Sequence, residues 1–255
     1  GSRREFPAVA VIVAKVDRIA IYDGDDPTLP MWMTFEPGGI IDWATSTQLR
    51  LNIHMLNGQL AEVGNDGGNL YSFIEDYVYV IYSSNNYPIT SSRTIEGRNN
   101  PGTYISSTGN AIDVYVVATY AMEDVAMTVL PNAPIDDKTG LPTPTIAVAT
   151  DGGVSVIKDD KSIVTITSST AAGGGYDPHH VSFDKANRLA LVQAYDSDAI
   201  YLDIFDNIPT SNIGQALSYS DATSYTYLDT GLNITGTTAA TTFKDLVHTK
   251  DDIAM

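Results

Sequence analysis

The chain has 255 residues, 43% of them hydrophobic and 18% charged, which is the composition of an ordered globular protein and excludes a disordered one. Its 31 acidic and 14 basic residues give a net charge of −17, so we expect no nucleic-acid partner. The absence of cysteine excludes disulfides, thiolate metal sites and cysteine nucleophiles. The apolar run at 8–14 is too short to cross a bilayer, so we expect no membrane insertion. Gly1-Ser2 is typical of a cleaved tag and suggests a piece of a longer protein.

Four stretches of the chain repeat one pattern, which is a short apolar strand, a turn containing Asp, and a second apolar run. The strand openings are Ile19, Leu60, Ile146 and Leu189. They are 41, 86 and 43 residues apart, so the middle interval equals two units of 43. Strand-only repeats of this length are typical of β-propeller blades. We therefore expect an all-β propeller of five to six units, with the four openings buried at equivalent positions.

In chain order, the sequence predicts one domain over 1–255 that is built of blade-like units and contains almost no helix. The expected units are 6–37, 40–82, 111–130, 145–167 and 180–206. We interpret 83–110 and 131–144 as inserted loops and 207–255 as a poorly defined end. Asn57-Gly58 lies between two alternating apolar runs and predicts a two-residue hairpin.

Three carboxylates occur close together in the first Asp-bearing turn, at Asp23, Asp25 and Asp26. Clustered oxygens of this kind suit a hard cation such as calcium. The spacing is not that of an EF-hand, and tight turns use Asp for local hydrogen bonds in any case. We favour the turn interpretation and expect no cofactor, with calcium as the alternative.

Four further residues are candidates for contact with a ligand. His179 and His180 precede a strand, near the edge of a blade where propeller loops surround a channel mouth. Adjacent residues of a regular strand face opposite sides, so we do not expect these two imidazoles to bind one metal together. Trp32 and Trp43 have rings that could stack on sugars.

No motif of high specificity for catalysis occurs in the sequence. The Gly-x-Ser-x-Gly elbow of serine hydrolases and the Ser-x-Asp-x-Gly-x-x-Trp box of sialidase propellers are both absent. Glutamate is rare, with six in the chain. We assign no catalytic residue and favour a protein that is not an enzyme.

Two runs of sequence carry a resemblance to a known group of proteins. One is Arg4-Glu5-Phe6-Pro7 with Ile19 to Pro27 and Leu29 to Met33, and the other is Gly140 to Asp159. Together they resemble the propeller-like segment of large predicted structural proteins of marine bacteriophages. The likeness covers most of 4–208. It implies a component of a tail or fibre and brings no catalytic residues.

From the repeat and the resemblance we expect a structural or recognition module located in the phage particle. Its partners would be other virion proteins or a cell-surface glycan, and an oligomer remains open. We expect the contacts in the loops 83–110 and 131–144, because insertions into a repeat gather on the binding face. The alternative is a carbohydrate-binding or glycosidase-like propeller.

Overall fold

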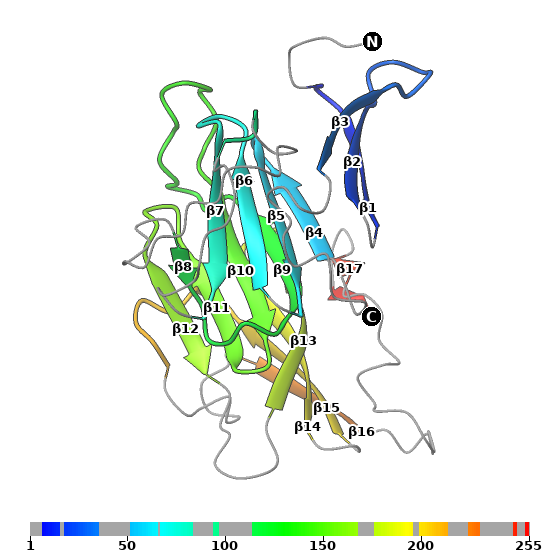
Figure 1. The fold of residues 1–255 in the computed structure, drawn as a ribbon. Helices are drawn as coiled ribbons and strands as arrows, with labels where there is room; N and C mark the ends of the chain where they lie inside the picture. The colour runs from blue at the N-terminus through cyan, green and yellow to red at the C-terminus, as the bar shows by residue number, and fades with distance from the viewer. Residues whose placement is uncertain are drawn as a thin grey trace.

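The computed structural model of the chain describes residues 7–15, 18–35, 52–65, 67–83, 94–96, 114–167, 176–195, 199–213, 224–229, 247–248 and 253–254. These residues form strands and turns only, as the β-branched and aromatic composition of the apolar runs predicts. The all-β prediction is confirmed. The strands belong to five separate sheets, which Figure 1 shows as several small layers, and the described residues contain no closed barrel or ring.

Sheets 1 and 2 come from the first part of the chain. Sheet 1 contains β1 (Ala10–Lys15), β2 (Arg18–Asp23) and β3 (Met31–Phe35). Sheet 2 contains β4 (Asn52–Leu56), β5 (Gln59–Gly64), β6 (Gly67–Ser72), β7 (Tyr77–Tyr82) and β8 (Val114–Val116). Neighbouring strands are antiparallel, except that β8 runs parallel to β7.

The remaining strands form two four-stranded antiparallel sheets and a short hairpin. Sheet 3 contains β9 (Met122–Thr128), β10 (Thr145–Thr150), β11 (Gly153–Ile157) and β12 (Ile163–Thr167). Sheet 4 contains β13 (Tyr176–Phe183), β14 (Leu189–Tyr195), β15 (Ala199–Phe205) and β16 (Ser224–Asp229). Sheet 5 pairs β17 (Val247–His248) with β18 (Ile253–Ala254).

The hairpin predicted at Asn57-Gly58 is confirmed. Leu56 of β4 pairs with Gln59 of β5, so the loop has two residues. Both loop residues have positive φ, 48° for Asn57 and 74° for Gly58. A tight hairpin turn of this kind needs positive φ at both positions, and Asn and Gly adopt it at least cost.

Sheets 1 to 4 pack face to face in chain order. One apolar cluster joins sheets 1 and 2 and includes Phe35 and Tyr71, whose ring centroids are 4.5 Å apart. A second joins sheets 2 and 3, and a third joins sheets 3 and 4. Alternate residues of a strand enter different clusters, so Leu60 faces sheet 1 while Ala61 faces sheet 3. Sheets 2 and 3 are therefore each buried on both faces.

The repeat in the sequence corresponds to one position in the sheets. Ile19, Leu60, Ile146 and Leu189 each lie on the second strand of a sheet and are at most 1% exposed. Each opening pairs across the ladder with a large buried residue; these partners are Phe35, Tyr71, Ile157 and Phe205.

The face on which an opening lies is not the same in every sheet. Leu60, Ile146 and Leu189 face the preceding sheet, whereas Ile19 faces the following one. The prediction of burial at the openings is confirmed for all four, but the equivalence of facing holds for three.

Two boundaries within the chain differ from the expected units. The stretch 111–130 is divided, because β8 completes sheet 2 and β9 begins sheet 3. The loop 131–144 connects β9 to β10 inside one sheet rather than joining two units. Sheets 2 and 3 are in direct contact, so the interval of 86 residues holds no additional sheet between them. The expected loop 83–110 lies outside the described residues except for 83 and 94–96.

Candidate functional site

The structure contains a cleft at the end of the interface between sheets 2 and 3. Residues of β5, β6 and β7 that face sheet 3 are apolar in the middle of the interface, as at Ala61 and Ile81. At the end of the strands the same face carries Gln59 and Ser72. There the apolar contact ends and a cleft of about 150 Å³ opens.

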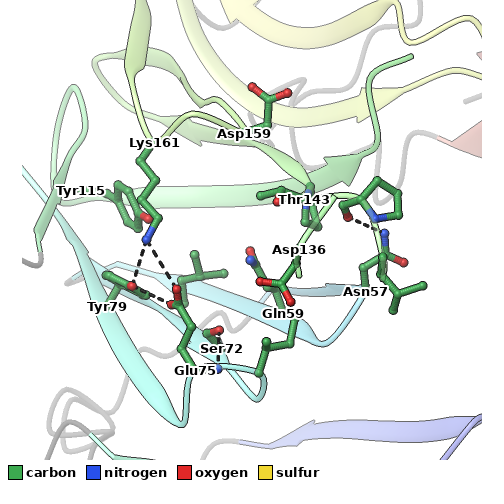
Figure 2. Close-up of a pocket in the computed structure, with 15 residues that line it drawn as sticks. Asn57, Gln59, Ser72, Glu75, Tyr79, Tyr115, Asp136, Thr143, Asp159 and Lys161 are labelled. Carbon is green, nitrogen blue, oxygen red and sulfur yellow. Dashed lines mark hydrogen bonds and ion pairs between the residues drawn. The ribbon is translucent and has the colours of Figure 1, made fainter. Parts of the chain in front are cut away.

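Four segments far apart in the sequence line this cleft. Sheet 2 and its turns supply one side, with Asn57, Gln59, Leu70, Ser72, Ile74, Glu75, Tyr79 and Tyr115. The loops of sheet 3 supply the other, with Asp136, Leu141, Pro142, Thr143, Pro144, Asp159 and Lys161. Figure 2 shows most of the polar members pointing into the space between the two sheets.

One end of the cleft holds a network of charged and phenolic groups (Figure 2). The Lys161 Nζ lies 3.6 Å from the Glu75 Oε1 and donates to the Tyr79 hydroxyl at 3.1 Å. The Tyr79 hydroxyl donates to the Glu75 Oε2 at 2.6 Å. The same Nζ lies 5.0 Å from the centroid of the Tyr79 ring, within the range of a cation–π contact.

The phenols of this end are held in their neutral form. Burial is the first cause that raises the pKa of Tyr79 above its ordinary value, and the hydrogen bond to Glu75 adds to it. Burial also raises the pKa of Tyr115 to about 12, although the Lys161 charge opposes the rise. Both hydroxyls therefore keep their protons at neutral pH, and the Tyr79 proton is already donated to Glu75.

The loop 131–144 is held against the cleft by its own hydrogen bonds. The Asp136 amide donates to the Leu141 carbonyl at 2.9 Å, and the Thr143 amide donates to the Pro134 carbonyl at 2.8 Å. The Thr139 amide and hydroxyl donate to the Asp136 Oδ1. The hydrogen bond from the Thr139 amide is the first cause that lowers the pKa of Asp136. The lining loop is thus pre-formed.

The predicted histidines lie elsewhere, where β13 meets β9. The His180 Nδ1 is 3.5 Å from the Asp124 Oδ2, and the His179 Nδ1 is 3.9 Å from the Glu123 Oε2. Bulges at His179 and at Glu123 interrupt both ladders. A bulge breaks the alternation of a strand, so both imidazoles lie against β9 and not on opposite sides.

Two more titratable groups, Asp151 and His54, interact with the charged residues at this contact between β9 and β13. Burial and the Glu123 charge raise the pKa of Asp151, against the effect of His179. Burial lowers the pKa of His54 on β4, and the Asp124 charge opposes this. In the part of the chain that the structure describes, no three His, Asp or Glu side chains are arranged to hold a metal ion.

The carboxylates of the first turn bind backbone amides. Asp25 accepts from the amides of Ala8 at 2.8 Å and Val9 at 3.1 Å. The Asp23 Oδ1 accepts from the Asp25 amide, and the Asp26 Oδ1 accepts from the Thr28 amide and hydroxyl. The contacts of Asp23 and Asp26 are the local turn hydrogen bonds that the sequence favoured, whereas Asp25 joins the turn to the segment before β1.

Of the two predicted tryptophan contacts, the structure describes Trp32. The Trp32 ring packs 5.9 Å from the Phe73 ring, at the contact between sheets 1 and 2, and does not line the cleft. Trp43 lies outside the described residues. The sequence predicts ligand contacts in 131–144, which does line the cleft, but it does not single out Glu75, Tyr79 or Lys161. No local pattern marks these three, since they meet only when sheets 2 and 3 pack.

A scan against protein-family models finds no match to the chain, and a search of curated proteins also finds none. Among the described residues there is no helix long and apolar enough to span a membrane.

Proposed function

We propose that the chain is a non-enzymatic recognition module of a bacteriophage particle, associated with its tail or fibre, which binds a cell-surface glycan in the cleft between sheets 2 and 3. The lining of the cleft carries this proposal. Carboxylate, amide and hydroxyl groups of Glu75, Gln59 and Thr143 suit the hydroxyls of a sugar, and the walls also include Tyr79 and Tyr115. The cleft is small beside the roughly 300–1,000 Å³ of drug-sized sites, which favours a single sugar ring.

Within this proposal the domain is a β-propeller. Its support is the order of packing, because sheets 1 to 4 stack face to face in chain order. Sheets 3 and 4, and strands β4 to β7 of sheet 2, each run as antiparallel meanders. The first strands of sheets 2, 3 and 4 are also neighbours, since β9 contacts both β4 and β13. Cryo-electron microscopy should show a closed ring with β4, β9 and β13 around its channel. A linear or two-layered stack of the four sheets would refute the propeller.

The phage location rests on the resemblance of residues 4–208 and makes other virion proteins the second class of partner. Binding of the purified chain to intact bacterial cells tests it. The proposal expects binding that is lost after periodate oxidation of the surface glycans. Binding that survives oxidation but is removed by protease treatment of the cells would contradict a glycan receptor.

A glycan array with two matched variants tests the cleft. Glu75→Gln removes a carboxylate from the lining, while Glu96→Gln makes the same change at an exposed position outside it. We expect Glu75→Gln to weaken binding at least tenfold and Glu96→Gln to leave it unchanged. Hydrolysis of a bound glycan that disappears in Glu75→Gln would instead support the glycosidase-like alternative.

A further inference from the structure

The two ends of the cleft differ in chemistry, and the charged end disfavours acidic ligands. Lys161 is the one cation of the described lining, and its ammonium is already engaged by Glu75 and by the Tyr79 hydroxyl. The lining also carries the carboxylates of Asp136 and Asp159. A ligand carboxylate or sulfate would meet a lining that carries more negative than positive charge, which costs free energy.

The opposite end of the cleft, around Asn57, includes apolar side chains among its lining residues. Ile74 lies beside the Asn57-Gly58 turn, since a Cβ built on Gly58 would be 3.1 Å from the Ile74 Cγ1. Pro142 is fixed there as well, because the Asn57 Nδ2 donates to its carbonyl at 2.8 Å. Leu141 adjoins Pro142 and keeps 43% of its surface exposed. An apolar surface next to a polar cleft is available for a small apolar group of the ligand.

Two side-chain amides stand next to these apolar residues. The Asn57 Nδ2 is used by Pro142, which orients the amide and leaves the Oδ1 as an acceptor. Gln59 begins β5 immediately after the turn, and its side chain makes no hydrogen bond to another described residue. One fixed acceptor and one uncommitted amide thus lie beside a surface of methyl and methylene groups.

We propose that the cleft selects a neutral sugar bearing an acetamido group. The acetamido group combines a methyl, one N–H donor and one carbonyl acceptor. Its methyl packs on Ile74, Leu141 and Pro142, its N–H donates to the Asn57 Oδ1, and its carbonyl accepts from the Gln59 amide. The sugar hydroxyls then point toward the charged end. This inference rests on the proposed function, because it names the class of glycan bound at the same site.

Isothermal titration of the intact chain with three oligosaccharide series of equal length tests the inference. The series are oligomers of N-acetylglucosamine, of glucosamine and of glucose. We expect the acetylated series to bind about tenfold or more tightly than either of the others, the discrimination typical of one apolar group held in a fitted pocket. Sialylated or uronic-acid oligomers should bind more weakly still.

Two variants of the loop 131–144 test whether the preference for the acetylated series depends on the lining of the cleft. Leu141→Ser removes an apolar side chain from the lining, and Ile135→Ser makes a comparable change at a residue that is 58% exposed and not part of the lining. The preference for the acetylated series should fall to within about threefold of the glucose series in Leu141→Ser and stay intact in Ile135→Ser.

The failure of this inference can be told apart from failure of the proposed function. Equal binding of the acetylated and glucose series, or an equal effect of the two serine variants, overturns the acetamido preference and leaves glycan recognition standing. Tighter binding of glucosamine that is lost in Asp159→Asn overturns it in favour of charge recognition. Absence of binding to every glycan, on the array and in titration, overturns both.

Discussion

Gln193 of β14 donates a side-chain hydrogen bond to Asp203 of β15, and both side chains are buried on the face of sheet 4 that packs against sheet 3. The Gln193 Oε1 has no hydrogen-bond partner among the described residues. A protonated Asp203 could donate to it and complete a pair of two hydrogen bonds. The contact between the two sheets is therefore sensitive to the charge of one carboxyl group.

Stability should depend on pH through Asp203. Burial raises the pKa of Asp203 to about 6, against the effect of the Gln193 hydrogen bond. The folded state holds this proton more tightly than the unfolded state, so the stabilisation is complete below pH 3.8 and is lost as the pH rises through about 6. The change in unfolding free energy is about 3 kcal/mol at most.

The variant Asp203→Asn measures this contribution. Urea denaturation should give wild type and variant similar unfolding free energies near pH 4, and the variant should become the more stable of the two at pH 7.5. If wild type and variant differ by the same unfolding free energy at pH 4 and at pH 7.5, Asp203 is not the source of the pH dependence.

His54 should make stability depend on pH in the direction opposite to that of Asp203. Burial lowers its pKa below the ordinary value of 6.5, so the unfolded state takes up the proton first as the solution becomes acidic. Stability from His54 is present above pH 6.5 and decreases below it. Thermal melts should show a smaller loss between pH 7 and pH 5 in His54→Gln than in wild type. An unchanged loss in the variant would rule out this role.

Truncation of the repeated core positions should be costly. Leu60→Ala, Ile146→Ala and Leu189→Ala each remove a side chain that is at most 1% exposed, and each should lower the unfolding free energy by about 2–5 kcal/mol. Ile135→Ala, at a residue 58% exposed, should cost no more than about 0.5 kcal/mol. Chemical denaturation provides both values. A cost below about 1 kcal/mol at the three core positions would argue against their packing between sheets.

Calcium should not stabilise the protein. The carboxylates of Asp23 and Asp25 accept hydrogen bonds from backbone amides and so already have a structural role. We expect the Tm to be the same in EDTA and in excess calcium. A bound ion at a hundredfold excess over its Kd would add about 2.7 kcal/mol, which a melt detects readily. A rise with calcium that vanishes in Asp25→Asn would require a metal site in this turn.

The repeat also appears at a position that the sequence alone did not single out. In sheets 2, 3 and 4, the residue two places after the opening pairs with a buried polar residue on the next strand. These polar residues are Asn69, Ser155 and Asp203. Each makes a side-chain hydrogen bond inside its own sheet or to a neighbouring segment. A buried polar group needs such a partner, so each of these three residues depends on its own hydrogen bond.

The sequence by itself determined the strands, the turn at Asn57-Gly58 and the burial of Ile19, Leu60, Ile146 and Leu189. These features follow from short-range causes, since side-chain alternation and positive φ are set within a few residues. Only the tertiary structure decided that β8 joins β7, that β9 belongs with β10, and that His179 and His180 both lie against β9.

The cleft is also a feature that only the tertiary structure decided. Glu75 and Lys161 meet because sheets 2 and 3 bury their facing apolar residues against one another. No local sequence pattern around either residue predicts that contact. Burial of apolar surface is non-directional, so the alternation of a strand shows which side chains need covering but not which sheet covers them.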